Sequence, residues 1–339
     1  MSTAAAAAAA RRAVVARHGV RPETWPLLGP GYAYAEVDDD AVVPYVDTGR
    51  AWVVAGPPIA APARQAEVAA ATSRAARRAG RELVWFAVDG DVVARLGADA
   101  CAFTVGAEPW WDAAAWAANL ASHRSLREQL RRARAKGVRV RPLDAAAWHA
   151  PPMHAALGVV AAAWLASRRM APLGFVVQLD VGAITAEARP FVAERDGQVV
   201  AFAVAWPAPA SATWLVRDLV RGPDAPSGTS ELLIDAVMRA AAVAGVHVTL
   251  GMVPLARQAG ELDGWLRTVR QATRRFYDVD GLAAFRSRLR PTAWAPVAIA
   301  SPAPRAAPLV IADVLAAFAG GSLAGFGWRS LRKPRAAIR

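Results

Sequence analysis

Apolar residues change their spacing along the stretch from Thr213 to Leu255. A period of two through Trp214, Val216 and Leu219 predicts a strand, and a helical spacing follows it. The period therefore switches from two to about 3.6 within one continuous segment. The apolar residues at helical spacing are Leu232, Leu233, Ala236, Val237 and Ala240.

A polar loop is expected between this strand and the helix. It should hold Asp218 and Arg221, and the helix should begin at Ser227-Gly228-Thr229. Gly245 is a typical helix stop, and the β-rich run 246–252 predicts a second strand. Because backbone N–H groups point outward at a helix N-terminus, the loop is a candidate site for an anion or an acyl group.

The stretch 51–88 has the same order of features. A strand containing Trp52 is followed by a proline-containing loop, a helix over about 63–79, a glycine and a strand over 82–88. Asp89-Gly90 then predicts a turn. A repeat of this size implies two copies of one α/β fold. Of the two loops, the later one carries more polar side chains and is the better candidate for chemistry.

Length and charge add to this picture. A chain of 339 residues with 55% apolar residues suits two domains, and the net charge of +12 favours phosphate-rich partners such as RNA or an anionic membrane. A GC-rich genome would also enrich the chain in arginine, so the net charge by itself is only weak support for such partners. The expected divisions are a disordered or loosely helical Ala/Arg tail at 1–20, an N-terminal domain at 21–150, a C-terminal domain at 151–300 and an amphipathic, basic tail at 301–339.

A strongly basic helix is predicted over 122–137, inside the N-terminal domain. Its six arginines and lysines, Arg127 and Arg131 among them, outnumber the single acidic residue Glu128. A solvated helix face and a phosphate-binding face are both consistent with this pattern. Trp110, Trp111 and Trp116, just before the helix, are expected in a core or interface rather than on an RNA-stacking surface.

Several other segments have simple predictions. Residues 191–194 and 199–206 should form a hairpin that pairs with the Trp214 strand. An apolar helix is expected over 153–167 and an amphipathic helix over 262–276. The lone Cys101 excludes an intrachain disulfide, and the histidines show no metal-binding spacing. The segment 308–339 predicts an interfacial membrane anchor or a terminal helix packed on the second domain, rather than a transmembrane span.

Ordered motifs in the second half carry a family resemblance. The chain resembles the C-terminal synthase domain of the lysyl-phosphatidylglycerol synthetase (phosphatidylglycerol lysyltransferase) family over residues 85–296. The motifs are FVAERDGQVVAFA, RDLVR with PDAPSG, LGMVPL and FYDVDGLAAFRSRLRP, together with the basic helix SLREQLRRARAKG and the segments AAWLASRR and LGF.

The resemblance implies a fold and a reaction. The fold is two tandem GNAT-like acyltransferase domains with mixed central sheets flanked by helices. The reaction is transfer of an aminoacyl group from aminoacyl-tRNA to the hydroxyl of phosphatidylglycerol. The family's functional aspartate and arginine correspond to Asp218 and Arg221, and two later lysines correspond to Arg286 and Arg288, which keep the charge but do not deprotonate. The family's multi-spanning flippase portion has no counterpart here, so lipid export by this chain is not expected.

These residues suggest a mechanism without a cofactor or metal. Asp218 would accept a proton and Arg221 would bind a phosphate, while anions would also be bound at Ser227, Gly228 and Thr229. Further binding residues would be Arg286, Arg288, Arg127 and Arg131. Asp224 would be a turn residue. Without the resemblance, an ion pair between Asp218 and Arg221 would be preferred.

The expected partners are aminoacyl-tRNA, an anionic membrane surface and, in addition, a separate membrane protein. The expected location is cytoplasmic and peripheral, at the inner face of the membrane. Two other functions stay open at this point. One is an acyltransferase that uses acyl-CoA, although the loop RGPDAPSGTS has two prolines that cannot donate N–H groups to a pyrophosphate. The other is a non-catalytic module that binds anionic lipid or RNA.

Overall fold

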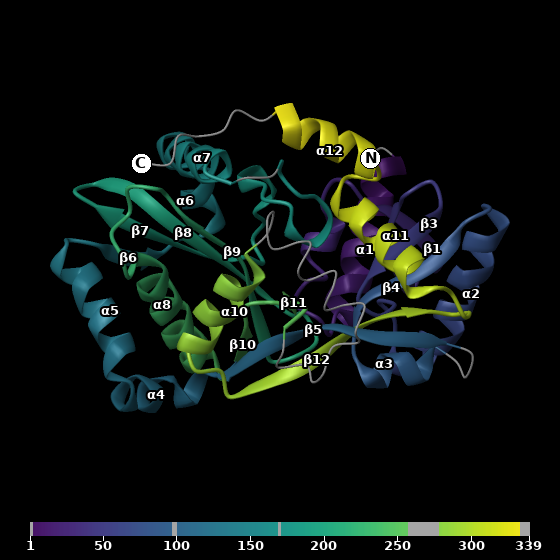
Figure 1. Cartoon of the computed structure of the whole chain (residues 1–339), viewed down its shortest axis with the longest axis horizontal. Helices are drawn as coiled ribbons and strands as arrows, with labels where there is room; N and C mark the ends of the chain where they lie inside the picture. Colours follow the sequence, from purple (N-terminus) through teal and green to yellow (C-terminus); the bar gives the residue numbers. More distant parts are fainter. Residues whose placement is uncertain (1–2, 97–99, 169–170, 257–277, 333–339) are drawn as a thin grey trace.

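A single mixed β-sheet runs through the whole molecule in the computed structural model, which describes residues 3–96, 100–168, 171–256 and 278–332 (Figure 1). Its strand order is β1-β2-β3-β4-β12-β5-β10-β9-β8-β7-β6, with β11 also paired to β5. The strands are β1 (Ala33–Asp38), β2 (Ala41–Asp47), β3 (Ala51–Ala55), β4 (Glu82–Val88), β5 (Cys101–Asp112), β6 (Arg139–Pro142), β7 (Arg189–Arg195), β8 (Gln198–Pro207), β9 (Thr213–Arg221), β10 (His247–Thr249), β11 (Val253–Pro254) and β12 (Ala293–Ser301).

Helices cover both faces of this sheet. Short 3-10 turns connect several of them, including η4 (Phe175–Val177) and η5 (Val181–Ala183). The helix predicted over 262–276 lies outside the described residues. The α-helices are α1 (Thr3–His18), α2 (Gln65–Arg78), α3 (Gly90–Arg95), α4 (Trp116–Ser122), α5 (Arg124–Ala135), α6 (Ala145–His149), α7 (Pro151–Ala166), α8 (Thr229–Ala244), α10 (Val279–Arg288), α11 (Ala307–Phe318) and α12 (Leu323–Arg332).

The two predicted strand-helix-strand units are both present. In the first unit β3 and β4 are parallel and joined through α2, and in the second β9 and β10 are parallel and joined through α8. All other strand pairs among the described residues are antiparallel. The hairpin of β7 and β8 pairs with β9 as predicted. The mixed α/β fold and its internal repeat are therefore confirmed.

The two faces of the sheet bury different helices. Side chains alternate along each strand, so Trp52 and Val54 of β3 pack with α2 whereas Val53 packs with α11. In the second half, Val216 of β9 packs with α8, and Phe202 of β8 packs with α7. We call the face under α7 and α11 the upper face, as in Figure 1, and the face under α2 and α8 the lower face.

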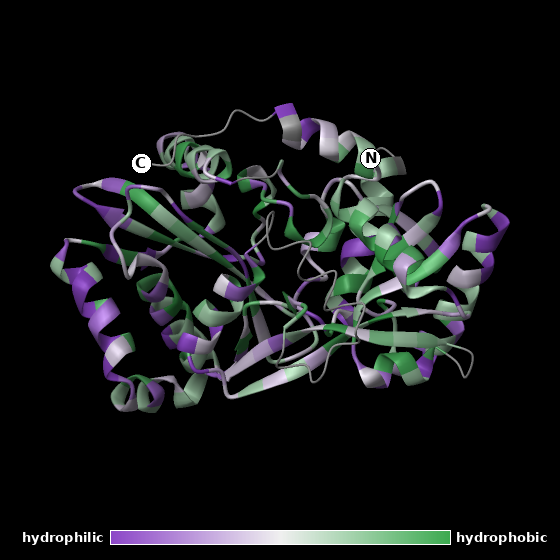
Figure 2. Cartoon of the chain, viewed as in Figure 1, coloured by the Kyte–Doolittle hydropathy of each residue, from purple (hydrophilic) through white to green (hydrophobic). Residues whose placement is uncertain are grey.

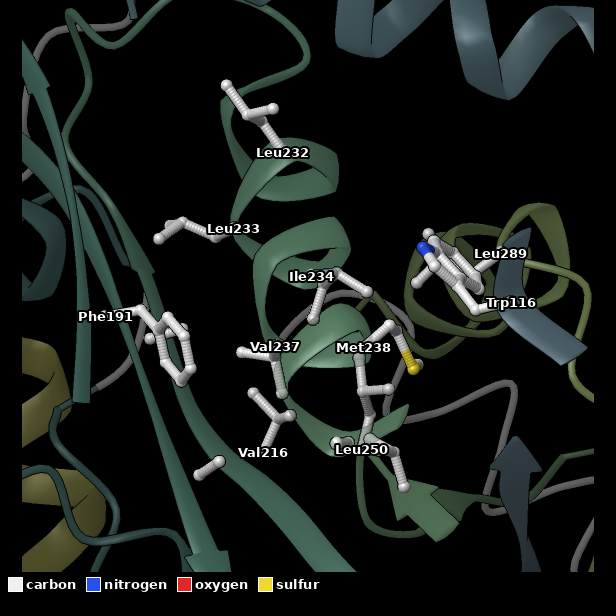
Figure 3. Close-up of a cluster of buried hydrophobic side chains, with 14 of the residues drawn as sticks. Trp116, Phe191, Val216, Leu232, Leu233, Ile234, Val237, Met238, Leu250 and Leu289 are labelled. Atoms are coloured by element: carbon white, nitrogen blue, oxygen red, sulfur yellow. The ribbon is translucent and has the colours of Figure 1, made fainter. Parts of the chain in front are cut away.

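The largest hydrophobic cluster lies on the lower face around α8. Leu233, Ile234, Val237 and Met238 project from successive turns of the helix toward the sheet and toward Trp116 (Figure 3). Trp111 and Trp116 are both buried in this cluster, so their predicted core role is confirmed. The cluster combines residues from both sides of position 150 in the sequence, and the domain boundary proposed there stays a prediction.

Several local predictions are wrong. Strand β9 continues through Arg221, so Asp218 and Arg221 lie in a strand and not in a loop. The run 246–252 is interrupted after Thr249, and its continuation is the two-residue strand β11. Asp89 does not form a hairpin turn, because its carboxylate accepts a hydrogen bond from the Val92 N–H at 2.9 Å and caps α3.

Helices α1 and α11, which lie near the two ends of the described chain, both pack on the upper face. The segment expected to be a disordered or loosely helical tail forms α1, whose Val14 and Val15 pack against Val42 and Ile59. Helix α11 packs against β3 and β4 of the first half and also against Phe175 of η4 in the second half. No single described helix is long and apolar enough to cross a bilayer, although α11 and Leu323–Ser330, bent by 55°, satisfy length and composition as a pair.

Candidate active site

A cavity of about 90 Å³ lies on the upper face near the centre of the molecule. Its walls come from α1 and the chain after it, from the segment 175–185 and from strands β8 and β9. Both halves of the molecule therefore contribute to it. The aromatic lining residues are Trp25, Tyr32, Phe175 and Trp206, and the charged or polar ones are Arg12, Gln178, Asp180, Thr185 and Arg217.

An ion pair on β9 borders this cavity. The Nε of Arg217 donates to Oδ2 of Asp218 at 3.0 Å, and the guanidinium lies over the Trp206 ring, 5.6 Å from its centroid. Asp218 is 7% exposed. Burial raises the pKa of the Asp218 carboxyl, and the Arg217 charge opposes this rise. A carboxylate with a raised pKa beside a cavity is suited to accept a proton.

A β-bulge places these two neighbours. In the pairing of β8 with β9, Ala205 lies opposite Val216 and Val204 lies opposite Asp218, so Arg217 is the extra residue. Asp218 therefore shares the upper face with Val204 and Trp206, and Arg217 reaches the cavity. Arg221 lies opposite Ala201, whose side chain packs on the lower face. The partner of Asp218 is consequently Arg217 and not Arg221.

Tyr32 is a further polar group in the cavity wall. Burial raises the pKa of its phenol, and the nearby Arg217 opposes this effect. The hydroxyl is therefore protonated at neutral pH and can donate a hydrogen bond. Asp180 also lines the cavity and acts on Asp218 by charge repulsion, which adds to the rise in the pKa of Asp218. Sequence analysis did not identify Tyr32, Asp180 or Arg217.

A second polar cluster is buried near the centre of the sheet. Glu108 of β5 accepts a hydrogen bond from the Thr249 hydroxyl at 2.8 Å, and its other oxygen lies 3.3 Å from an Arg21 guanidinium nitrogen. Arg21 also lies 3.4 Å from Glu23. Burial raises the pKa of the Glu108 carboxyl, and Arg21 opposes the rise. The cluster connects the segment after α1 with the middle of the sheet.

The start of α8 is closely packed and is not an open anion site. Gly228 is its N-cap residue, with φ +89°, and a Cβ atom there would lie 2.2 Å from the backbone oxygen of Gln129 in α5. Thr229 is fully buried, and its hydroxyl donates to the Pro226 carbonyl at 2.7 Å. Ser227 is exposed beside them. Helix α5 therefore covers the position where an acyl-CoA enzyme would bind pyrophosphate.

The predicted arginines occupy several separate places. Arg286 donates to the carbonyls of Leu250 and Gly251, and its charge lowers the pKa of Glu108, although burial dominates there. Arg288 is exposed at the end of α10. None of Arg221, Arg286 and Arg288, all within the described ranges, lines the central cavity. Asp218 does not line the cavity itself and borders it through its ion pair with Arg217, while the three arginines expected beside Asp218 lie elsewhere.

The basic helix α5 exposes Arg127 and Arg131 to solvent, although both have partners within the protein. Arg127 donates to the carbonyls of Leu120 and Ala121 at the end of α4. Arg131 pairs with Glu128 at 2.7 Å. Both arginines are exposed, and α5 lies on the lower face against α8, away from the cavity (Figure 1). The helix is a candidate for phosphate contacts rather than a part of the cavity.

Comparison with known proteins gives the family. The model of the family described as "Phosphatidylglycerol lysyltransferase, C-terminal" matches residues 12–300. The chain belongs to this family. The match covers the cavity, the Arg217–Asp218 pair and the basic helix. No curated protein sequence matches the chain significantly.

Solved structures of the family have the same fold. The chain is 22% identical to the C-terminal domain of a putative lysylphosphatidylglycerol synthetase from Agrobacterium fabrum, with a TM-score of 0.79 over 94% of this chain and 99% of that one. It is 18% identical to L-PGS from Bacillus licheniformis, with a TM-score of 0.78 over 95% and 97% of the two chains. A structure of FemX matches with 10% identity and a TM-score of 0.55 over 85% and 94%. These similarities show a shared fold.

Proposed function

We propose that this chain is an aminoacyltransferase that moves an aminoacyl group from aminoacyl-tRNA to the hydroxyl of phosphatidylglycerol or a related lipid. The observation that carries the proposal is the buried Arg217–Asp218 pair beside a cavity between the two halves, within the phosphatidylglycerol lysyltransferase C-terminal family. The substrates are those named by the family, and no cofactor is required for their reaction.

The reaction is the exchange of one ester for another. The lipid hydroxyl oxygen attacks the carbonyl carbon of the aminoacyl ester, and a tetrahedral oxyanion forms. The bond to the ribose oxygen of the tRNA then breaks, and the proton lost by the lipid hydroxyl passes to that leaving oxygen. The protein must hold the two substrates together, accept and return one proton, and stabilise the oxyanion.

The residues around the cavity suit these tasks. Asp218 is the proposed proton acceptor, because burial brings the pKa of its carboxyl closer to neutrality. Arg217 is the proposed partner of the oxyanion or of a lipid phosphate, and Tyr32 is a second donor. Arg127 and Arg131 on α5, with Arg288 on α10, are proposed contacts for tRNA phosphates. Arg286 is proposed to hold the loop after β10, since it donates to two of that loop's carbonyls.

Use of acyl-CoA has less support. Such enzymes bind pyrophosphate with free N–H groups at a helix start. Here Pro223 and Pro226 have no N–H, the Thr229 N–H donates to the Pro226 carbonyl at 3.2 Å, and α5 packs over Gly228. The cavity on the upper face is consequently the better reaction site.

The test measures aminoacyl-lipid formed from mixed aminoacyl-tRNA and phosphatidylglycerol vesicles. Asp218→Asn should lower the rate by about a hundredfold or more, because general-base catalysis contributes on that order. Asp224→Asn is the matched control, since Asp224 is exposed in the loop before α8 and its loss should leave the rate close to wild type. Comparing Arg217→Ala with Arg221→Ala identifies the guanidinium that serves the reaction, and the geometry favours Arg217.

Two outcomes would contradict the proposal. One is the absence of aminoacyl-lipid with the wild-type protein and every common amino acid. The other is an Asp218→Asn protein that retains full activity in every assay, which would favour the non-catalytic module. Tight calorimetric binding of acetyl-CoA would instead favour the acyl-CoA enzyme.

A further inference from the structure

Exposed apolar side chains are concentrated on one part of the upper face. Of the eight large hydrophobic side chains that are exposed among the described residues, six belong to α7, η4, α11 and α12. These elements lie together along the top of the molecule in Figure 1, and hydrophobic segments are visible on them in Figure 2. The six residues are Val159, Val177, Leu309, Leu315, Leu323 and Trp328.

Helix α7 presents an apolar stripe to solvent. Ala155, Val159, Ala162 and Ala166 are all exposed and lie on one side of the helix, because they are separated by three or four residues. Val159 is 70% exposed. The opposite side of α7 buries Leu157 and other residues against the sheet. A helix that is apolar on its outer side as well as its inner side is typical of a surface that contacts something other than water.

Helices α7 and α12 end in the same way. Arg168 lies over the Trp164 ring at 4.4 Å, and Arg332 lies over the Trp328 ring at 4.2 Å. In each case the arginine follows the tryptophan by four positions. The two ends are connected, since the Ala171 N–H donates to the Ser330 hydroxyl at 3.2 Å. Tryptophan with a neighbouring arginine is the combination that locates helices at the boundary between lipid and water.

The charge of this surface has one sign. Helices α7 and α12 contain no acidic residue, and the single carboxylate of α11, Asp313, is buried and paired with Arg50 at 2.7 Å and Arg305 at 2.9 Å. Arginines therefore border the apolar patch without exposed carboxylates on the same helices. This arrangement complements anionic lipid headgroups.

The patch also reaches the cavity. Phe175 and Gln178 line the cavity wall, and exposed Val177 lies between them in the chain. Phe175 packs edge-to-face on Phe318 of α11, with ring centroids 5.3 Å apart. Lipid at the patch would therefore be adjacent to the candidate reaction site.

We propose that α7, η4, α11 and α12 form a docking surface for an anionic bilayer, on which this chain lies with the cavity facing the lipid. The apolar side chains enter the headgroup boundary, and the arginines at the helix ends bind lipid phosphates. The surface involves no transmembrane insertion, since α11 already buries Val310, Val314 and Ala317 against the sheet. The docking surface would bring the lipid hydroxyl to the cavity, and this part of the inference rests on the proposed function.

The test is flotation of the full chain with vesicles, without tRNA. Wild-type protein should bind equimolar phosphatidylcholine and phosphatidylglycerol vesicles, bind phosphatidylcholine alone more weakly, and lose affinity as salt rises. The double variant Val159→Ser with Trp328→Ser should bind about tenfold more weakly or worse, because two anchoring side chains are lost. Val243→Ser is the matched control, since Val243 is 92% exposed on α8 at the other face and should not affect binding.

The outcomes distinguish a bilayer from a second copy of the chain as the partner of this surface. Equal vesicle binding by the double variant and wild type would overturn the proposal. So would a wild-type protein that forms a dimer and does not bind vesicles, if the double variant is a monomer. An unchanged thermal midpoint shows that the variants are folded. In aminoacyl transfer to monomeric short-chain phosphatidylglycerol, the double variant should keep its rate, while its rate on vesicles falls. Vesicle binding with no transfer by any protein would contradict the proposed function and leave the docking surface intact.

Discussion

Glu108 is a carboxylate in the interior of a mostly apolar sheet. Only 2% of its surface is exposed, and its partners are the Thr249 hydroxyl and the Arg21 guanidinium. Removing a charge from water costs more than a partner at 3.3 Å returns, so the pKa of the carboxyl lies above its ordinary value. Through Arg21, the charge of Glu108 in the sheet interacts directly with the segment that follows α1.

This raised pKa makes the stability dependent on pH. Folded Glu108 holds its proton to a higher pH than in the unfolded chain, so the native state binds more protons between the two pKa values. Stability should therefore fall as pH rises from the ordinary glutamate pKa through the folded pKa, by about 1.4 kcal/mol for each unit between them. Glu108→Gln should remove this component of the slope, measured as the free energy of unfolding in denaturant across mildly acidic pH.

A control separates Glu108 from other carboxyls. Glu67→Gln on α2 changes an exposed residue and should keep the wild-type slope. Asp218 contributes a component of the same sign that both variants retain, since burial also raises the pKa of its carboxyl. A Glu108→Gln protein whose slope equals that of wild type would show that Glu108 does not titrate in this way.

At the scale of single residues, motif order indicated Asp218 as a candidate but not its surroundings. Its neighbour in the candidate site is Arg217, which reaches the cavity because of the bulge opposite Val204 and Ala205. Strict alternation along β9 gives no indication of this bulge. The bulge depends on the register in which β9 pairs with β8, and local sequence propensity does not determine that register. Tyr32 and Asp180 are likewise brought in by tertiary packing.

The two strand-helix-strand units were predictable as elements. A change of hydrophobic period and a terminal glycine are local signals, and they correctly indicated α8 and its end at Gly245. The loop after β9 was not predictable in the same way. Polar Asp218 and Arg221 suggested that the strand had ended, whereas pairing with β8 extends it to Arg221. Tertiary pairing thus overrode the local polarity.

Close packing between α5 and α8 gives a test at this scale. Gly228 has φ +89°, and an added Cβ would meet the Gln129 carbonyl of α5 at 2.2 Å. Gly228→Ala should cost about 3 kcal/mol or more, because backbone strain adds to a clash with backbone atoms that have no rotamer to change. The measurement is the denaturant midpoint for unfolding.

Gly245→Ala is the matched control for Gly228→Ala. Gly245 also has a positive φ of +66°, but a Cβ there would meet nothing within 4 Å. Its cost should be about 1–2 kcal/mol, from the left-handed conformation alone. Equal costs at the two positions would mean that α5 does not approach the start of α8 as closely as described.

On the scale of the whole molecule, the two halves share one sheet. Strand β12 follows the second half in the chain but pairs with β4 on one side and β5 on the other. Contacts from the N-terminal segment reach the second half as well, through Arg12 with Glu187. The duplicated pattern therefore predicted two similar units but not their fusion, because strand order depends on pairings between segments that are far apart in sequence.

A shared sheet should unfold as a unit. Loss of the first half would remove both partners of β12 and the strands on which α11 packs, and loss of the second half would remove β10, which pairs with β5. We therefore expect a single transition in which calorimetric and van't Hoff enthalpies agree. Asp313→Asn weakens the attachment of α11 to the sheet, because it leaves the largely buried Arg305 without its charged partner on α11. It should lower stability by about 3 kcal/mol and keep one transition, whereas exposed Asp224→Asn should change stability by less than about 0.5 kcal/mol. Two resolved transitions in the wild-type protein would show that the halves are energetically separate despite their common sheet.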